Sequence, residues 1–294
     1  MIHASTDLER RTIMPGTLYL CATPIGNLED ITLRVLRILK EADLIAAEDT
    51  RNSIKLLNHF DIHTPLTSYH EFNKVEKAHE LVGQLLSGKN IALITDAGTP
   101  GISDPGEVLV RFAREQGISV TSLPGAAAAI TALSGSGQST RRFAFEGFLP
   151  REKKERREIL SSLSTETRTI IVYEAPHHLC DTLKDLYEAL GDRNLSVCRE
   201  LTKKHEEYLS LTLTGAIHRC EETDPRGEYV LVIEGKDPRE LIRQKQEKYE
   251  SISIKEHVES YESLGMDRKE AMKAVAKDRG IGKREVYEAL LKND

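Results

Sequence analysis

The stretch IALITDAGTPGISDPG, residues 91–106, decides the fold of this chain. Its first four residues are all apolar, which is typical of a strand buried on both faces of a parallel sheet. Residues 96–106 then contain three glycines and two prolines, so the chain turns tightly and exposes backbone groups. A helix is predicted after this turn, with Asp104 as its N-cap, Pro105 in its first position and Glu107 completing a capping box.

A second strand and glycine turn follow directly along the chain. Residues 118–123 are predicted to form a buried strand, after which Pro124 and Gly125 lead into a helix that begins with four alanines. The carboxyl ends of parallel strands meet at one edge of a sheet, so the two turns predict a ligand-binding crevice there. Glycines that only turn the chain are the alternative, but Gly and Ala crowd both strand ends more than turning requires.

The composition indicates a globular protein of about two domains. The 294 residues are 39% hydrophobic and 30% charged, and no apolar run approaches the ~20 residues of a membrane span. Residues 1–13 have no apolar core like that of a signal peptide, and we expect them to be a disordered tail of a cytoplasmic protein. The net charge of −6 is unlike that of a generic nucleic-acid binder, so an anionic partner requires local basic patches.

The four cysteines have no CxxC spacing, and apolar or helical segments flank them. We interpret Cys21, Cys180, Cys198 and Cys220 as buried thiols in a reducing cytoplasm, rather than as disulfide partners or metal ligands. No metal site is predicted.

Short apolar strands alternate with amphipathic helices along the first half, which predicts a mostly parallel sheet with right-handed crossovers. We expect an N-terminal α/β domain at residues 14–133 and a flexible linker at residues 134–141, where Ser and Gly alternate. A second α/β domain is expected at residues 142–236. Its sheet is predicted to be mixed, because segments 207–213 and 228–233 read as an antiparallel pair.

Residues 237–294 are charged and helical, and they predict a separate C-terminal module with three short helices in its last part. Residues 267–284 hold seven basic and three acidic groups. This pattern fits a helix-turn-helix-like module and a small helical cap equally well.

Polar clusters follow three of the strands predicted in the first domain. They read PIGN at residues 24–27, EDTR at residues 48–51 and HEFN at residues 70–73. Three clusters at equivalent strand ends favour a functional edge. Two of them also have simpler explanations: the EDTR acids suit the dipole at a helix N-terminus, and HEFN is compatible with a solvated loop. The basic run REKKERR at residues 151–157 is compatible with a solvated helix face and with RNA contact.

Several common catalytic motifs are absent from the sequence. There is no GxxxxGK[ST], which argues against a P-loop, and no HExxH, paired-cysteine or GxSxG motif. A hydrolase or metalloenzyme would therefore lack its usual signature.

Six segments together resemble the RsmI family of bacterial methyltransferases. They are GTLYLCATPIGNLEDITLR from residue 16, AEDTR, TDAGTPGISDPG, SLPGAAAAITAL, FEGFLP and YEAPHHL. The resemblance implies transfer of a methyl group from S-adenosylmethionine to the 2′-hydroxyl of a cytidine in small-subunit (16S) ribosomal RNA. Where cobalt-corrin and uroporphyrin enzymes of the same superfamily read GDP, this chain has Gly98-Thr99-Pro100, which favours the RNA branch.

The resemblance also implies a tetrapyrrole methylase fold, in which two α/β domains hold the donor between them, with a small helical tail domain. The expected partners are the small ribosomal subunit and a second copy of the chain, with no membrane. Two alternatives stay open at this stage: a methyltransferase for a tetrapyrrole-type small molecule, and a ribosome-binding protein without catalytic activity.

Site residues are expected in three groups. The family pattern places donor-binding residues at Pro24, Ala97, Gly98, Thr99, Ile102, Ala127, Ala128, Glu174 and Leu201. A weakly nucleophilic ribose hydroxyl benefits from a proton acceptor, and the candidates at the same sheet edge are Glu48, Asp49, His70 and Glu71, with Glu146 and Glu174 as lesser ones. Contacts to RNA phosphate or ribose are expected from Arg51, Asn73, Arg34, Arg37, Arg151, Lys153, Lys154, Arg156 and Arg157, together with the C-terminal tail.

Overall fold

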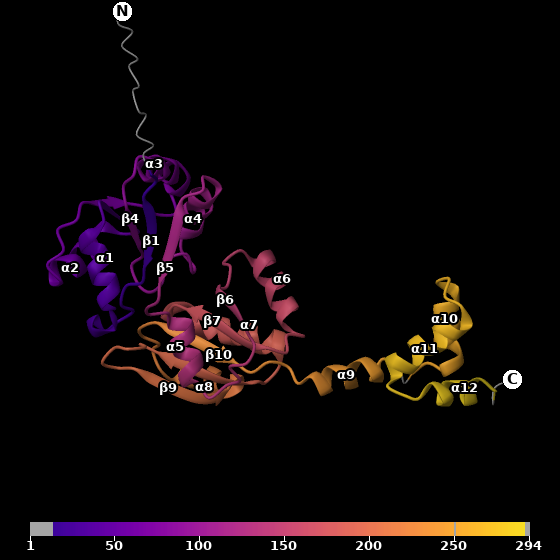
Figure 1. Cartoon of the computed structure of the whole chain (residues 1–294). Coiled ribbons are helices and arrows are strands. Elements are labelled where there is room, and N and C mark those ends of the chain that lie inside the picture. The colour runs from indigo at the N-terminus through magenta and orange to yellow at the C-terminus, as the bar shows by residue number, and fades with distance from the viewer. Residues whose placement is uncertain (1–13, 250, 292–294) are drawn as a thin grey trace, which may run out of the picture.

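The computed structural model describes residues 14–249 and 251–291, and the tail expected at residues 1–13 lies outside them. Two α/β domains are followed by a helical module that stands away from both (Figure 1). None of the described helices is long and apolar enough to cross a membrane.

The first domain is built on a five-stranded sheet in which every pairing is parallel, as predicted. Its order is β3-β2-β4-β1-β5, so the strand of the opening motif, β4, is central. The strands are β1 (Thr17–Cys21), β2 (Leu44–Ala47), β3 (Leu66–Ser68), β4 (Ile91–Ile94) and β5 (Ser119–Leu123).

Helices cover both faces of this sheet, which is why the inner strands β2 and β4 are apolar without alternation. Helices α3 (Lys74–Leu86) and α4 (Gly106–Glu115) pack on one face, through Leu81 and Leu109. Helices α1 (Leu33–Glu41) and α2 (Thr50–His59) pack on the other face through Val35 and Leu57. A 3₁₀ turn, η1 (Leu28–Asp30), precedes α1.

The start of α4 differs from the prediction in detail. The N-cap position falls on Pro105, and the helix begins at Gly106. Asp104 instead folds back into the preceding loop, where its carboxylate accepts hydrogen bonds from the backbone amides of Gly101, Ile102 and Gly106 at 2.7–3.1 Å. One carboxylate thus satisfies three amides of the glycine-rich loop and fixes its shape.

The second domain has a mixed five-stranded sheet of order β6-β7-β10-β8-β9. Only β6 and β7 pair in parallel, and the other pairings are antiparallel. The strands are β6 (Phe143–Phe148), β7 (Thr169–Glu174), β8 (Asn194–Arg199), β9 (Glu207–Thr212) and β10 (Tyr229–Ile233). The helices are α5 (Ala128–Gly135), α6 (Lys153–Leu163), η2 (Pro176–His178), α7 (Leu179–Leu190) and α8 (Leu213–Glu222).

One sequence-based expectation for this domain is wrong, and another differs from the observed helix bounds. Strands β9 and β10 do not pair with each other, because α8 separates them and β8 lies between them in the sheet. The expected linker begins inside α5, which packs through Ala132 and Leu133 against β7 and β10 (Figure 1). The core of the second domain therefore includes residues that precede the expected linker. The outer limits of the domains stay a prediction.

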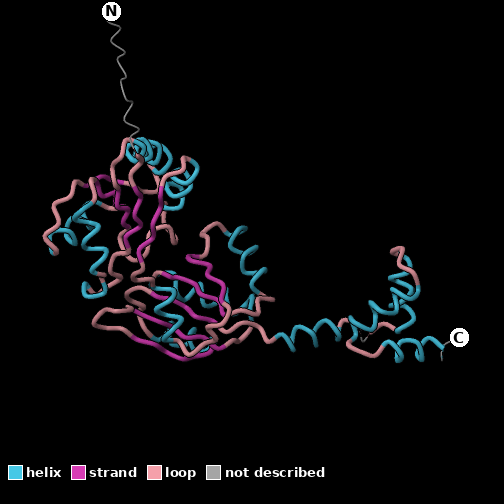
Figure 2. Tube along the Cα trace, viewed as in Figure 1, coloured by secondary structure: helices cyan, strands magenta, loops and turns pink. Residues whose placement is uncertain are grey.

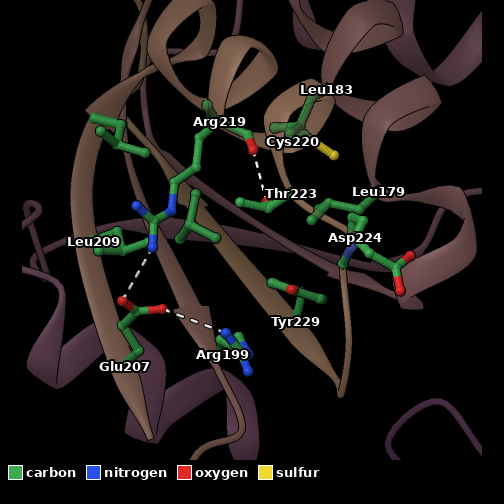
Figure 3. Close-up of a pocket in the computed structure, with 14 residues that line it drawn as sticks. Leu179, Leu183, Arg199, Glu207, Leu209, Arg219, Cys220, Thr223, Asp224 and Tyr229 are labelled. Atoms are coloured by element: carbon green, nitrogen blue, oxygen red, sulfur yellow. Dashed lines mark hydrogen bonds and ion pairs between the residues drawn. The ribbon is translucent and has the colours of Figure 1, made fainter.

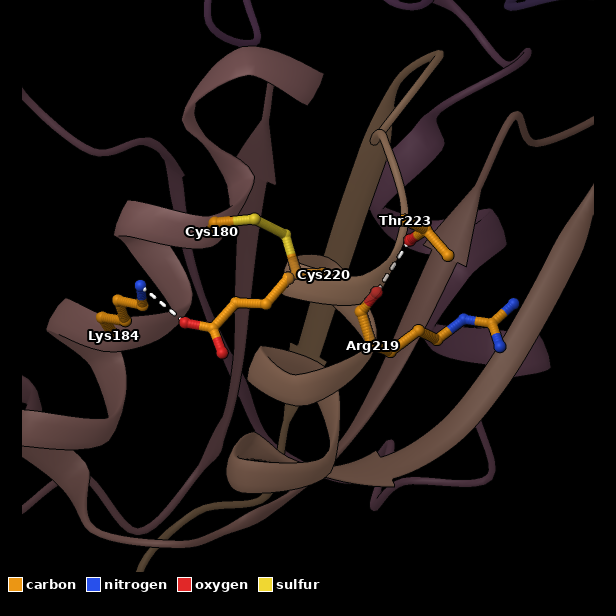
Figure 4. Close-up of a disulfide and its surroundings, with 6 residues drawn as sticks. Cys180, Lys184, Arg219, Cys220 and Thr223 are labelled. Carbon is orange, nitrogen blue, oxygen red and sulfur yellow. Dashed lines mark hydrogen bonds and ion pairs between the residues drawn. A yellow bond between two sulfur atoms is a disulfide. The ribbon is translucent and has the colours of Figure 1, made fainter.

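Two of the four cysteines differ from the prediction of free thiols. Cys180 on α7 and Cys220 on α8 form a disulfide with a Cα–Cα distance of 5.7 Å (Figure 4), so these two are not free thiols. The sequence shows no CxxC pattern because the partners are 40 residues apart and meet only after both helices pack on the sheet. Cys21 and Cys198 are free and buried, and burial raises the pKa of the Cys21 thiol to about 12 and that of Cys198 to about 11.

The C-terminal module contains α9 (Pro238–Glu247), α10 (Ile254–Ser263), α11 (Arg268–Arg279) and α12 (Lys283–Leu291). The last three helices share a small core formed by Val258, Val275 and Val286. Gly280 ends α11 in the left-handed conformation with a φ of 65°, and α12 follows within three residues. Helix α9 connects this core to the second domain (Figure 1).

Candidate active site

One end of the first sheet faces the second domain, as the tube in Figure 2 shows. The parallel strands finish at this end, because Gly26 in the loop after β1 lies against Leu201 of the second domain. Loops 23–27, 97–106 and 124–127 leave these ends, and loop 23–27 meets loop 200–203 of the second domain at Gly26. We call these four segments the interdomain loop cluster. Thr23 and Gly98 hold two of the loops together through an antiparallel bridge with N–O distances of 2.9 and 3.0 Å. A third loop joins them because the Thr99 hydroxyl donates to the carbonyl of Ala126 at 2.9 Å.

Two glycines of this cluster, Gly26 and Gly125, sit where no side chain fits. A Cβ atom on Gly125 would lie 2.5 Å from the Cβ of Ala22, and one on Gly26 would lie 3.0 Å from the carbonyl oxygen of Leu201. Gly98 and Gly101 have φ angles of 88° and 85°, which favour glycine. The two domains therefore touch through backbone, which exposes amides and carbonyls to a ligand.

Backbone strain concentrates in the same place. Among residues 14–249 and 251–291, four non-glycine residues have left-handed backbone, and Ser103, Glu200 and Thr202 of these belong to the interdomain loop cluster. Such residues gather at ligand-binding sites because the surrounding structure must hold them in place. The hydroxyl of Thr202 is buried next to Gly26 and has no hydrogen-bond partner. It is therefore a polar group that a ligand could satisfy.

Most of the residues expected to bind the methyl donor lie in or beside this cluster, and one of them lies in the core of the second domain. Segment Ala97–Ile102 and the alanines Ala127 and Ala128 lie in or beside the cluster, as do Pro24 and Leu201. Glu174 is only 6% exposed, and its carboxylate accepts hydrogen bonds from Thr182 and from the amide of Ala175. Its side chain is thus committed to the second domain.

The acidic cluster after β2 is tied to the end of β4. The carboxylate of Glu48 accepts hydrogen bonds from the hydroxyl of Thr95 at 2.6 Å and from the amide of Asp96 at 3.4 Å. Asp49 caps α2 and binds Arg51 through both carboxylate oxygens. These hydrogen bonds from Arg51 lower the pKa of Asp49 to about 2. Asp49 is therefore a weak proton acceptor, whereas Glu48 is fixed near the loop that follows β4.

The segment after β3 is joined to the opening motif by Tyr69, whose hydroxyl donates to the carbonyl of Pro105 at 2.9 Å. Asn73 accepts a hydrogen bond from the amide of His70 at 2.8 Å and so closes the turn. Asn73 thus has a structural partner already. The Nδ1 atom of His70 is buried without a partner, and Glu71 pairs with Lys74.

Phe72 in this turn was not among the residues expected from the sequence. Its side chain is 97% exposed, the largest fraction among the exposed large hydrophobic residues of the described chain. The sequence did contain a signal for this residue, since it is the one aromatic ring of the phenylalanine, tyrosine or tryptophan type inside the otherwise polar HEFN turn. Aromatic side chains of this kind stack on unpaired bases in RNA-binding proteins.

The expected RNA-binding cations are mostly exposed, with one clear exception. Arg156 donates to Asp185 at 2.6 Å and to the hydroxyl of Thr182 at 2.9 Å, which explains its partial burial. Arg37 forms an exposed ion pair with Glu41. The remaining cations of this group are exposed at the surface: Arg34, Arg51, Arg151, Lys153, Lys154 and Arg157.

A cavity of about 100 Å³ lies elsewhere, between β8, β9, β10 and the helices α7 and α8 (Figure 3). Its polar wall contains Arg199 and Arg219 on either side of Glu207, at 3.7 and 3.3 Å, together with Asp224. The charges of these two cations and two carboxylates cancel, and the rest of the lining is mostly apolar. This cavity is on the opposite face of the second sheet from α5, so it does not belong to the interdomain loop cluster.

Comparison with known proteins identifies the family. The family model "Tetrapyrrole (Corrin/Porphyrin) Methylases" matches residues 17–216. The chain is 53% identical over 272 residues to the "Ribosomal RNA small subunit methyltransferase I" of Halalkalibacterium halodurans, covering 92% of this chain and 93% of that protein. The chain belongs to the RsmI family. The Bacillus subtilis protein of the same name is 50% identical, over 93% of this chain and 94% of its own length.

Solved structures support the fold of this RsmI-family protein. Uroporphyrin III C-methyl transferase from Thermus thermophilus superposes with a TM-score of 0.54 and 18% identity, over 74% of this chain and 97% of its own. A diphthine synthase superposes with a TM-score of 0.57 and 13% identity, over 74% and 90%. The predicted tetrapyrrole methylase fold is confirmed, and by its family the chain is a methyltransferase that uses S-adenosylmethionine.

Proposed function

We propose that this protein methylates the 2′-hydroxyl of a cytidine ribose in small-subunit ribosomal RNA. The observation that carries the proposal is about 50% identity, over nearly the full length of both chains, to relatives named as small-subunit rRNA methyltransferases. A tetrapyrrole-type acceptor is less favoured, because the uroporphyrin enzyme is only 18% identical. A purely binding role is less favoured because the acidic groups at the functional edge would repel RNA without contributing to its binding.

The interdomain loop cluster is suited to the donor. S-adenosylmethionine supplies a methyl group on a cationic sulfonium, and its adenine and amino-acid parts require hydrogen bonds and close approach. The small residues Ala97, Ala127 and Ala128 allow close approach. The amides of Ala97 and Thr99 remain for a ligand, because those of Gly98, Gly101 and Ile102 already donate to Thr23 and Asp104. The hydroxyl of Thr202 offers a buried donor and acceptor without a partner in the protein.

Glu48 and His70 are the proposed proton acceptors for the ribose hydroxyl. Glu48 follows β2, the neighbour of β4, and is held by Thr95 at the end of β4. His70 follows the edge strand β3, and the preceding Tyr69 ties this segment to the loop after β4 through the carbonyl of Pro105. A pKa of about 2 makes Asp49 a poor acceptor at neutral pH, since efficient bases have pKa values near the working pH. Positioning of the hydroxyl against the donor would supply much of the rate, up to ~7–11 kcal/mol in favourable cases.

The proposed RNA surface consists of exposed cations and Phe72. Arg51 and Phe72 follow neighbouring strands, β2 and β3, at one edge of the sheet, so a ribose phosphate and its base could be held side by side. The exposed cations of α1 and of segment 151–157 extend this surface. Arg156 and Asn73 are left out because they are partly buried as well as hydrogen-bonded, whereas Arg51 stays 87% exposed although it pairs with Asp49.

Two further parts of the proposal concern assembly and location. We propose that the protein acts as a homodimer, as the family resemblance implies, and that it works in the cytoplasm, where ribosomal subunits are its substrate. Cross-linking followed by light scattering would test the dimer, since a single-chain mass would refute it.

The decisive experiment is transfer of labelled methyl from S-adenosylmethionine to small subunits from a strain that lacks this gene. Nucleoside analysis should then yield a 2′-O-methylated cytidine derivative. Measurable donor binding without transfer to subunits or to free rRNA would refute the proposed acceptor. Single-turnover assays of Glu48→Gln and His70→Ala would test the proton acceptors, because a residue whose replacement leaves the rate intact is not required.

A further inference from the structure

Helices α11 and α12 of the C-terminal module enclose a groove of about 420 Å³. Its floor is formed by Met272, Leu290 and Leu291. The aromatic ring of Tyr287 forms part of the wall, and the Tyr287 side chain is 53% exposed. The remaining lining residues are Arg268, Lys269 and Lys283.

The charge of the groove is entirely of one sign, since all three of its charged lining residues are cations. Nearby acids of the module have partners: Asp278 accepts a hydrogen bond from Tyr261, and Glu256 completes the capping box of α10. Glu262 pairs with the groove residue Arg268 at 4.0 Å, so Lys269 and Lys283 are the main source of the positive charge. The whole chain carries a net charge of −6, so this groove is a local departure from its surroundings. An anionic occupant is therefore favoured here.

We propose that this groove binds a single-stranded segment of RNA, as an anchor separate from the interdomain loop cluster. One base stacks on Tyr287 over the apolar floor, and the phosphates on either side contact Lys269 and Lys283. Exposed aromatic rings flanked by cations are the usual platform for unpaired nucleotides. The inference rests on the proposed function for its choice of RNA as the nucleic acid.

An acidic amphipathic peptide is the competing anionic occupant. Such a helix requires apolar anchors spaced over at least two turns along a trough. The apolar lining here offers only three side chains, Met272 on α11 and Leu290 and Leu291 in the last turn of α12, which fits a single base better than a helix face. The module also stands away from the two α/β domains (Figure 1), so a long RNA could reach both this groove and the cluster. Two linked contacts increase the overall affinity without further interface.

The test uses the full-length protein with small subunits and with a short, labelled single-stranded RNA. The groove variants are Lys269→Glu with Lys283→Glu, and Tyr287→Ala. Lys277→Glu on the same helix is the matched charge control, and Tyr187→Ala, an exposed tyrosine of α7, is the matched aromatic control.

The Lys269→Glu/Lys283→Glu variant should bind the short RNA at least ~10-fold more weakly, with a shallower dependence of log affinity on log salt, by about 0.7 for each phosphate contact removed. Tyr287→Ala should weaken binding by about 5- to 150-fold, and Tyr287→Trp should restore it. For subunit methylation, we expect a higher KM with kcat unchanged, while donor affinity stays at the wild-type value.

Groove variants that bind RNA as tightly as the two controls would overturn the proposal. Wild-type protein that binds an acidic amphipathic peptide but no RNA would also overturn it, in favour of a protein partner. The proposed function fails separately. Suppose that the wild type transfers no methyl to subunits but binds the short RNA, and that only the groove variants lose this binding. The groove proposal then stands, and the proposed activity is refuted.

Discussion

Replacing Gly125 by alanine would test whether backbone-to-backbone contact forms the donor site. The added Cβ would lie 2.5 Å from the Cβ of Ala22, which cannot rotate away, so the two loops must separate by more than an ångström. Overpacking of this kind costs about 1–3 kcal/mol of stability. Because Gly125 directly precedes Ala126, whose carbonyl accepts from Thr99, the shift reaches the donor loop as well. A displacement of that size can reduce the methyl-transfer rate by roughly 100-fold.

Gly83 provides the matched control. It lies in helix α3, and a Cβ added there would have nothing within 4 Å, so Gly83→Ala should stabilise the protein by about 0.8–1.0 kcal/mol and leave donor binding unchanged. Urea unfolding and calorimetric titration with S-adenosylmethionine would measure both effects for each variant. A Gly125→Ala protein that unfolds at the wild-type urea concentration and binds the donor normally would refute the steric reasoning.

Three further predictions concern the second domain and the RNA surface. Hydrogen bonds from Arg168 lower the pKa of Glu166 to about 2, so Glu166→Gln should lower the free energy of unfolding by about 1.5–3 kcal/mol at pH 7. In urea titrations, the difference between variant and wild type should shrink as the pH falls below about 4.5 and vanish below about 2. A difference that stays constant with pH would contradict this prediction. Reduction of Cys180–Cys220, which closes a loop over a separation of 40 residues, should lower the free energy of unfolding by about 3–4 kcal/mol, whereas a double serine variant should not respond to reductant. Phe72→Ala should raise the KM for subunits by about 5- to 150-fold while stability changes by less than about 0.5 kcal/mol, and an unchanged KM would argue against stacking.

Much of the first domain could be predicted from sequence because its strands are covered on both faces. Runs such as residues 91–94 are apolar throughout, and this signal is local. The pairing of β9 was not predictable in the same way. Helix α8 contains Gly215 and several polar residues, so it read as a connection, and strand order depends on contacts between distant segments. The Cys180–Cys220 disulfide was not predicted for the same reason, because its partners meet only in the folded chain.

The expected meeting of several strand ends at one edge of the sheet is present in the structure, whereas the roles assigned to individual residues stay predictions. Parallel topology brings the strand ends together, so Glu48, Asp49 and His70 do follow neighbouring strands. The partners of a side chain are set by packing, which sequence does not reveal. Arg156 was therefore expected to contact RNA although it binds Asp185, and Glu174 was expected to bind the donor although Thr182 and Ala175 occupy its carboxylate.

The left-handed residues of loop 200–203 explain how the second domain can present backbone to the proposed donor site. Left-handed backbone costs a non-glycine residue about 1–3 kcal/mol, so Glu200 must be held by other contacts. Its carboxylate accepts from Lys203 at 2.8 Å and from the amide of Glu228 at 3.1 Å. Gly227 makes this possible, because a Cβ there would lie 2.5 Å from the side chain of Glu200. The glycine and the ion pair together fix the loop, which leaves the hydroxyl of Thr202 free for a ligand.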